Sequence, residues 1–123
     1  MKLINSFKFA IAGFLHCVKH ERNFRIHLLA AVVIIALAVM FDLSRFEIVV
    51  LIFAIALVLI TEMINTAIER VVDHLTTEHN ESAKIAKDVA AGAVFVSAVF
   101  AAIVGAVVFI PAAVSAIRIF FNL

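Results

Sequence analysis

Three long apolar runs limit what this 123-residue chain can fold into. They occupy residues 26–41, 46–60 and 89–110, and the only ionisable side chains within them are those of His27 and Glu47. A helix needs about 20 residues to cross the roughly 30 Å of a bilayer's hydrocarbon core, and flanking residues bring the two shorter runs to that length. Because 66% of the residues are hydrophobic, against roughly 45–50% in an ordinary soluble domain, the sequence predicts a helical integral membrane protein and excludes a soluble domain.

The connections between the runs predict how the spans are arranged. Only residues 42–45 separate the first two runs, which is enough for a tight turn between antiparallel helices. We therefore expect a single membrane domain over residues 1–123. Its spans are expected over about 26–41, about 45–75 with a cytosolic extension, and about 85–110.

The N-terminal segment, about residues 2–19, has the periodicity of an amphipathic helix. At 100° per residue its polar side chains fall within an arc of about 160°, and large apolar side chains fill the opposite side. The polar members are Lys2, Asn5, Ser6, Lys8, His16 and Lys19. A signal peptide has no such stripe, so we predict a surface helix in the bilayer interface. Cys17, the only cysteine, is expected on the membrane-facing side as a small apolar residue.

The charged residues exclude one class of partner and predict an orientation. Ten Lys and Arg against nine Asp and Glu give a net charge of +1, whereas a nucleic-acid binder needs a concentrated basic face. Eight of the ten basic residues lie before the first span or around the second loop. By the positive-inside rule, the N-terminus and the second loop are expected in the cytoplasm and the C-terminus outside.

A polar stripe continues the second span beyond Ile60. Its members fall within about 100° of a helical wheel, and apolar residues occupy the opposite side. They are Glu62, Asn65, Thr66, Glu69 and Asp73. Carboxylates that share one face near hydrocarbon repel each other and are costly, so they need a partner or a function. Mg²⁺ held by carboxylates and substrate phosphates supplies both, and a face that is merely solvated or packed in a bundle is the alternative.

Two further polar clusters are expected at the same cytoplasmic level. One is Glu-Arg-Asn-Phe-Arg at 21–25, and the other is Lys-Ile-Ala-Lys-Asp at 84–88. Taken alone, they are explained equally well or better as snorkelling side chains and a positive-inside anchor. Together with the acid stripe they place carboxylates, Lys and Arg at one depth, which suits a metal-bound polyphosphate.

Glycine and histidine give weaker signals. The three glycines lie too far apart to form a phosphate-binding loop. His16 and His20 are one helical turn apart, but the sequence offers no third ligand for zinc. His27, His74 and His79 are expected to be interfacial polar residues.

One set of residues is specific enough to indicate a family. It comprises Glu-Met-Ile-Asn-Thr-Ala-Ile-Glu at 62–69, Asp73, Ala-Lys-Asp at 86–88, and Glu21 upstream. In these residues the chain resembles the prokaryotic diacylglycerol kinase family over almost its whole length. The Glu-Arg-Asn cluster at 21–23, the run that begins at Lys87 and the Phe-Ile-Pro near the end look most like the Gram-positive undecaprenol kinase branch.

This resemblance implies an all-α integral membrane protein. Each subunit would have three transmembrane helices and an N-terminal amphipathic surface helix, and the assembly would be a homotrimeric helical bundle with shared active sites in the bacterial plasma membrane. The implied activity is that of an ATP-dependent lipid kinase. With Mg²⁺ as cofactor, it would phosphorylate the hydroxyl of a membrane lipid alcohol at the cytoplasmic interface.

The resemblance also implies roles for single residues. Glu62 corresponds to the family's catalytic base, and Glu21 and Glu69 correspond to its metal-binding acids. The nucleotide site would comprise Glu21, Asn65, Glu69, Glu78, Asn80, Lys87 and Asp88. Supporting residues would be Asp73 and Arg25. The base assignment agrees with chemistry, because a carboxylate at the bilayer surface can accept the proton of a primary alcohol, which is otherwise a poor nucleophile.

The identity of the lipid and the class of function leave alternatives. Undecaprenol, giving undecaprenyl phosphate, is the expected substrate, and diacylglycerol, giving phosphatidic acid, is the alternative. A small proton-coupled transporter and a purely structural membrane protein are alternatives of other classes. Transporter sites lie near the bilayer midplane, whereas these acids lie at one end of a span. A structural protein leaves the acid stripe unexplained.

Overall fold

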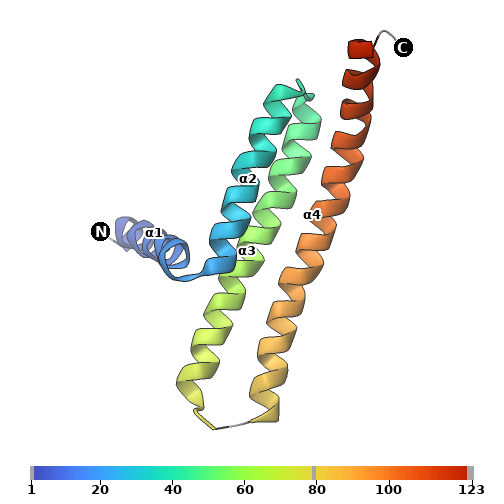
Figure 1. The fold of residues 1–123 in the computed structure, drawn as a ribbon. Helices are drawn as coiled ribbons and strands as arrows, with labels where there is room; N and C mark the ends of the chain where they lie inside the picture. Colours follow the sequence, from blue (N-terminus) through green and yellow to red (C-terminus); the bar gives the residue numbers. More distant parts are fainter. Residues whose placement is uncertain (1, 79, 122–123) are drawn as a thin grey trace.

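The chain forms three long helices that lie side by side, with an additional helix projecting from them (Figure 1). The computed structural model describes residues 2–78 and 80–121. Its helices are α1 (Lys2–His20), α2 (Arg22–Met40), α3 (Arg45–Leu75) and α4 (Glu81–Phe121). Of these, α2, α3 and α4 are long and apolar enough to cross a membrane, and the described ranges contain no strand. The all-α membrane fold with three spans and an N-terminal helix is therefore confirmed, and the trimer stays a prediction.

The helices α2 and α3 form an antiparallel hairpin (Figure 1). In the turn, Asp42 adopts a positive φ of 52°, which reverses the chain direction within a few residues. Ser44 Oγ accepts a hydrogen bond from the Glu47 N–H at 3.3 Å, and Glu47 Oε2 accepts one from the Ser44 N–H at 2.8 Å. This reciprocal capping box satisfies two backbone donors at the start of α3. The one acid in the second apolar run, Glu47, therefore has a structural role.

The apolar core lies near the hairpin end of the bundle, where three helices meet. Ala38 of α2, Leu51 of α3 and Val108 of α4 are buried together there. Farther along, the hydroxyls of Thr61 and Ser97 form a 2.8 Å hydrogen bond between α3 and α4. Outside these contacts the three helices expose most of their large apolar side chains. That exposure suits a chain whose surroundings are lipid or other subunits.

Helix α4 is longer than the sequence predicts. The expected span ends at about residue 110, but the helix continues through Pro111 to Phe121. Proline removes one backbone hydrogen bond, and it usually kinks or ends a helix in water. Membrane helices tolerate it, because unbroken helix is the main way to satisfy backbone groups in hydrocarbon. The segment after Pro111 is therefore a direct extension of the span.

Helix α1 projects sideways from the N-terminal end of α2 (Figure 1). Most of its side chains are exposed, as a surface helix requires, but Cys17 is only 4% exposed. The expectation that Cys17 faces the membrane is wrong. The C-terminal part of α1 packs against α2 and α3, where burial raises the pKa of the Cys17 thiol and a hydrogen bond with Thr66 opposes that rise. A helical wheel of α1 alone cannot show that α2 and α3 cover this part of the helix.

Candidate active site

The centre of the candidate site is Glu62, an almost completely enclosed residue of α3. It is 5% exposed and lies just beyond the apolar run of that helix. Its Oε1 is 3.6 Å from Nε2 of His27 on α2 and has no hydrogen-bond partner among the described residues. A buried carboxylate oxygen without a donor is costly. Helix packing alone therefore does not explain this residue.

Asn65 and Glu69 extend the site along α3. Asn65 Nδ2 donates a hydrogen bond to Glu69 Oε1 at 3.1 Å, whereas Asn65 Oδ1 is buried and has no partner in the described part of the chain. At 1.5 Å per residue, Glu69 lies roughly 10 Å along the helix axis from Glu62. The helix thus presents a carboxylate, an amide with an unused acceptor, and a second carboxylate in succession.

Glu21 brings a carboxylate from another part of the chain. It is the one residue between α1 and α2, and its backbone is extended, with φ −102° and ψ 113°. Its Oε1 lies 3.6 Å from Arg70 Nη2 on α3. Both Glu21 and Glu69 act electrostatically on Glu62. The change of chain direction at Glu21 therefore adds a third carboxylate to the two on α3.

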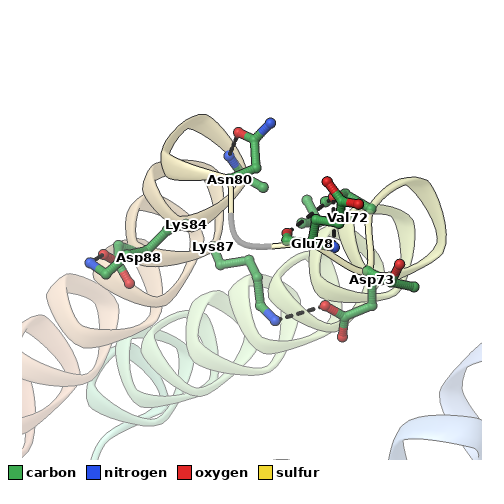
Figure 2. Close-up of a pocket in the computed structure, with 10 residues that line it drawn as sticks. Val72, Asp73, Glu78, Asn80, Lys84, Lys87 and Asp88 are labelled. Carbon is green, nitrogen blue, oxygen red and sulfur yellow. Dashed lines mark hydrogen bonds and ion pairs between the residues drawn. The ribbon is translucent and has the colours of Figure 1, made fainter.

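A second polar region lies where α3 and α4 are joined. It is a pocket of about 490 Å³ between the end of α3 and the start of α4. Figure 2 shows Lys87 extending from α4 toward Asp73 of α3, with 2.8 Å between Lys87 Nζ and Asp73 Oδ1. Glu78, Asn80 and Asp88 also line the pocket. The sequence predicts Glu78, Asn80, Lys87 and Asp88 in a nucleotide site, and it predicts Asp73 as a supporting residue.

Three polar side chains that line this pocket, Asn80, Lys84 and Asp88, have partners near the start of α4. Asn80 Oδ1 accepts a hydrogen bond from the Ala83 N–H at 3.1 Å and so caps the helix. Lys84 Nζ and Asp88 Oδ2 form an ion pair at 2.6 Å, one turn apart on α4. Such exposed contacts are weak. They can be exchanged for contacts with a charged ligand at little cost.

The expected site residues therefore form two neighbouring groups. The first contains Glu21, Glu62, Asn65 and Glu69, and the second contains Asp73, Glu78, Asn80, Lys87 and Asp88. Glu69 and Asp73 connect them, because four residues of helix rise only about 6 Å. Two groups this close can hold different parts of one elongated ligand. His79 lies outside the described residues.

Arg25 is the expected site residue that joins neither group by a direct contact. Its Nη1 donates a hydrogen bond to the backbone oxygen of Lys19 at 3.2 Å. A basic side chain in this position satisfies a carbonyl at the C-terminal end of a helix. Arg25 thus joins the end of α1 to the start of α2, and its supporting role in the site stays a prediction.

Two residues that contact the acids were not identified from the sequence, namely His27 and Arg70. His27 is the only ionisable residue in its apolar run, and this was the available signal. It lies eleven residues before Ala38 of α2, and Glu62 lies eleven residues after Leu51 of α3. Because the helices are antiparallel and Ala38 packs with Leu51, that equal spacing places His27 beside Glu62.

The carboxylates fit a divalent cation that is shared with a ligand. Within the described ranges no three His, Cys, Asp or Glu side chains form a complete metal cage. Mg²⁺ does not require one, because it is usually held by one or two carboxylates together with water and substrate phosphates. Glu21 and Glu69 can supply two such carboxylates, and the unused Oδ1 of Asn65 adds a neutral acceptor.

Comparison with known proteins identifies one family. A family model described as prokaryotic diacylglycerol kinase matches residues 8–109. A diacylglycerol kinase of Synechocystis is 43% identical over 110 residues, which are 89% of this chain and 63% of that protein. An undecaprenol kinase of Bacillus subtilis is 38% identical over 110 residues, 89% of each chain. A diacylglycerol kinase of Pseudomonas aeruginosa is 38% identical over 96 residues, 78% of each chain.

Proposed function

Because this chain belongs to the prokaryotic diacylglycerol kinase family and is a membrane lipid kinase, we propose that it transfers the γ-phosphate of ATP to the hydroxyl of undecaprenol. The product would be undecaprenyl phosphate. The observation that carries this proposal is the enclosed carboxylate of Glu62, which follows the apolar run of α3 and precedes Asn65 and Glu69. Family membership gives the class of reaction, and this arrangement supports a reaction of the acceptor at the membrane boundary.

Glu62 is proposed to be the general base. The alcohol oxygen attacks the γ-phosphorus while its proton moves to a Glu62 carboxylate oxygen, and the bond from phosphorus to the bridging oxygen breaks to release ADP. A primary alcohol is a poor nucleophile unless a positioned base removes its proton. The long hydrocarbon tail of the acceptor can stay in the bilayer throughout, because Glu62 lies directly beyond an apolar stretch of helix.

The polyphosphate is proposed to lie along the two polar groups, from Glu69 to the pocket beside Lys87. Mg²⁺ on Glu21 and Glu69 would neutralise phosphate oxygens. Lys87 would exchange Asp73 for the phosphates and stabilise charge on the transferred group. The remaining polar residues proposed to line the nucleotide are Asn65, Glu78, Asn80 and Asp88.

We propose an orientation with the N-terminus and the active site in the cytoplasm, in a bacterial plasma membrane. The support is the distribution of Lys and Arg, eight of which precede the first span or flank the second loop. ATP is available on that side of the membrane. The exposed polar residues of α1 would then meet lipid headgroups, with Lys2 and Lys8 near the phosphates.

A homotrimer with shared active sites is proposed as the working assembly. Most large apolar side chains of α2, α3 and α4 are exposed in one chain, and helix contacts between subunits would cover some of them. The small residues on α4, such as Ala98, Ala101 and Gly105, allow helices to approach closely. Glu21 and Glu69 are half-buried in a single chain, and a neighbouring subunit could cover them further.

Undecaprenol is proposed ahead of diacylglycerol on two grounds. The B. subtilis undecaprenol kinase aligns over 89% of each chain, whereas the more similar Synechocystis diacylglycerol kinase is matched over only 63% of its length. A groove of about 390 Å³ also runs from His27 along α2, α3 and α4, and apart from His27 its lining is apolar. An isoprenoid alcohol has no ester groups to hydrogen-bond, so such a lining suits its chain.

The test is a direct comparison of acceptors. Purified protein in detergent micelles is given radiolabelled ATP, Mg²⁺ and either undecaprenol or diacylglycerol at equal mole fraction, and the initial rates of lipid phosphorylation are compared. We expect undecaprenol to react faster. Faster phosphorylation of diacylglycerol would overturn the proposed acceptor but keep the kinase chemistry. No phosphorylation of either lipid would overturn both acceptors.

A further inference from the structure

The roles assigned above do not account for the contact between His27 and Glu62. His27 is the only ionisable residue of α2 after Arg25. Its side chain is 27% exposed and the Glu62 side chain 6%. The 3.6 Å between Nε2 and Oε1 is slightly longer than a hydrogen bond. Glu62 Oε1 has no other partner among the described residues.

The charges around Glu62 explain why this contact matters. Three ionisable residues act on it electrostatically: His27, Glu69 and Glu21. Two of them are acids, which repel a negative carboxylate. Of these three residues, His27 is therefore the one whose N–H can stabilise the negative charge of the Glu62 carboxylate. Truncating a buried carboxylate's one partner leaves the charge uncompensated.

The position of His27 adds a second observation. Its ring lies beside Glu62 and also lines the groove of about 390 Å³ whose other lining residues are apolar. His27 is therefore the polar side chain that lines the groove and also contacts Glu62.

We propose that His27 is a positioning residue for Glu62. Its Nε2–H holds Oε1 of the carboxylate, so that Oε2 is the oxygen that receives the proton of the lipid alcohol. A histidine N–H can orient a catalytic carboxylate without taking part in the bond changes, much as second partners orient ligands in metal sites. This inference rests on the proposed function, since it assigns Glu62 the role of base.

The first experiment compares two replacements of His27. His27→Leu removes the N–H and is expected to lower kcat about 10- to 100-fold, the range found when an orienting partner is lost. The KM for MgATP should not change, because the residues proposed for the nucleotide are left intact. His27→Gln restores an N–H donor of similar reach, and its kcat should stay within about threefold of the parent. His74→Leu, at an exposed position of α3, is the matched control and should have no effect.

The results that would overturn the proposal are specific. Equal losses of kcat in His27→Leu and His27→Gln would mean that the donor is not what matters. A loss in His27→Leu that follows the fraction of folded protein, with specific activity unchanged, would indicate a structural role only. A raised KM for MgATP at constant kcat would place His27 on the nucleotide instead.

A second experiment does not depend on activity. The thermal unfolding of the protein in detergent is measured for His27→Leu, for Glu62→Gln and for the double variant. If the two side chains interact, His27→Leu lowers Tm in the parent and changes it much less in the Glu62→Gln background. Additive changes in Tm would overturn the contact. If the parent phosphorylated no lipid alcohol, the proposed function would fail, and this cycle would still decide whether His27 holds Glu62.

Discussion

The apolar run of α3 has a glutamate near each of its ends, and the two acids have different surroundings. Glu47, at the hairpin end, is half-buried, and both of its capping hydrogen bonds with Ser44 are formed. Glu62 is enclosed, and its Oε1 has no hydrogen bond within the described residues. An acid whose bonds are complete within its own helix stabilises that helix. An acid that is buried without a complete set of bonds is available to a ligand or substrate.

The largest effect is expected at Glu62, the acid whose hydrogen bonds are incomplete. Glu62→Gln keeps the shape of the side chain but cannot accept a proton, so we expect kcat to fall about 10²- to 10⁴-fold. Binding of MgATP, measured by titration calorimetry on the same preparation, should be close to normal. Glu47→Gln is the matched control and should keep its activity. Turnover of Glu62→Gln within a few-fold of the parent would remove it from the role of base.

The next largest effect concerns the metal. Glu69→Gln and Glu21→Gln each remove one anionic oxygen ligand, and each should raise the Mg²⁺ concentration needed for half-maximal activity by roughly tenfold. The measurement is a magnesium titration of lipid phosphorylation at saturating ATP. Glu78→Gln, an exposed acid in the α3–α4 connection, gives a comparison in which the magnesium requirement should change less. Unchanged titrations for both Glu69→Gln and Glu21→Gln would defeat the metal assignment.

A smaller effect is expected from the lysines beside the pocket. Lys87 reaches across to α3, whereas Lys84 pairs with Asp88 on its own helix. Lys87→Met should lower kcat/KM for MgATP about 10-fold, and Lys84→Met should lower it less than about threefold. Steady-state kinetics with ATP as the varied substrate measure both. Equal losses would mean that the two lysines act only through their charge and not through their different positions.

The smallest effect on catalysis is expected at the hairpin end. Ser44→Ala removes the N-cap of α3 and should lower the free energy of unfolding by about 1 kcal/mol. Thermal unfolding in detergent measures that loss, and the specific activity of the folded fraction should be unchanged. A large loss of specific activity would show that the Ser44–Glu47 cap and the Glu62 site are coupled, so that the two acids do not have separate roles.

Much of the fold follows from short-range patterns that a single sequence contains. The lengths of the apolar runs predict three spans, and the four residues at 42–45 predict a hairpin, because both depend only on neighbouring residues. The helix that continues through Pro111 was not foreseen. A proline ends a helix in most soluble contexts, and the bilayer changes that balance.

The site was predictable in composition but not in its contacts. A helical wheel places Glu62, Asn65 and Glu69 on one face, since residues three, four and seven apart share a side of a helix. It gives no information about which residue of α2 faces Glu62. That depends on the hairpin register, which the packing of Ala38 with Leu51 determines. The burial of Cys17 was missed for the same reason, because it depends on where α1 meets α3.

The joint at Glu21 has a consequence for how this chain can vary in length. One residue connects a helix proposed to lie along the membrane surface with one proposed to cross it, and the same residue carries a carboxylate of the site. Each residue added to a helix rotates the remainder of that helix by about 100°. A single insertion or deletion next to Glu21 would therefore turn the lysine-bearing side of α1 away from the headgroups, or else carry the carboxylate away from Arg70. The joint can therefore accept substitutions more easily than a change in the number of residues. The number of residues between α1 and the candidate site is expected to be fixed.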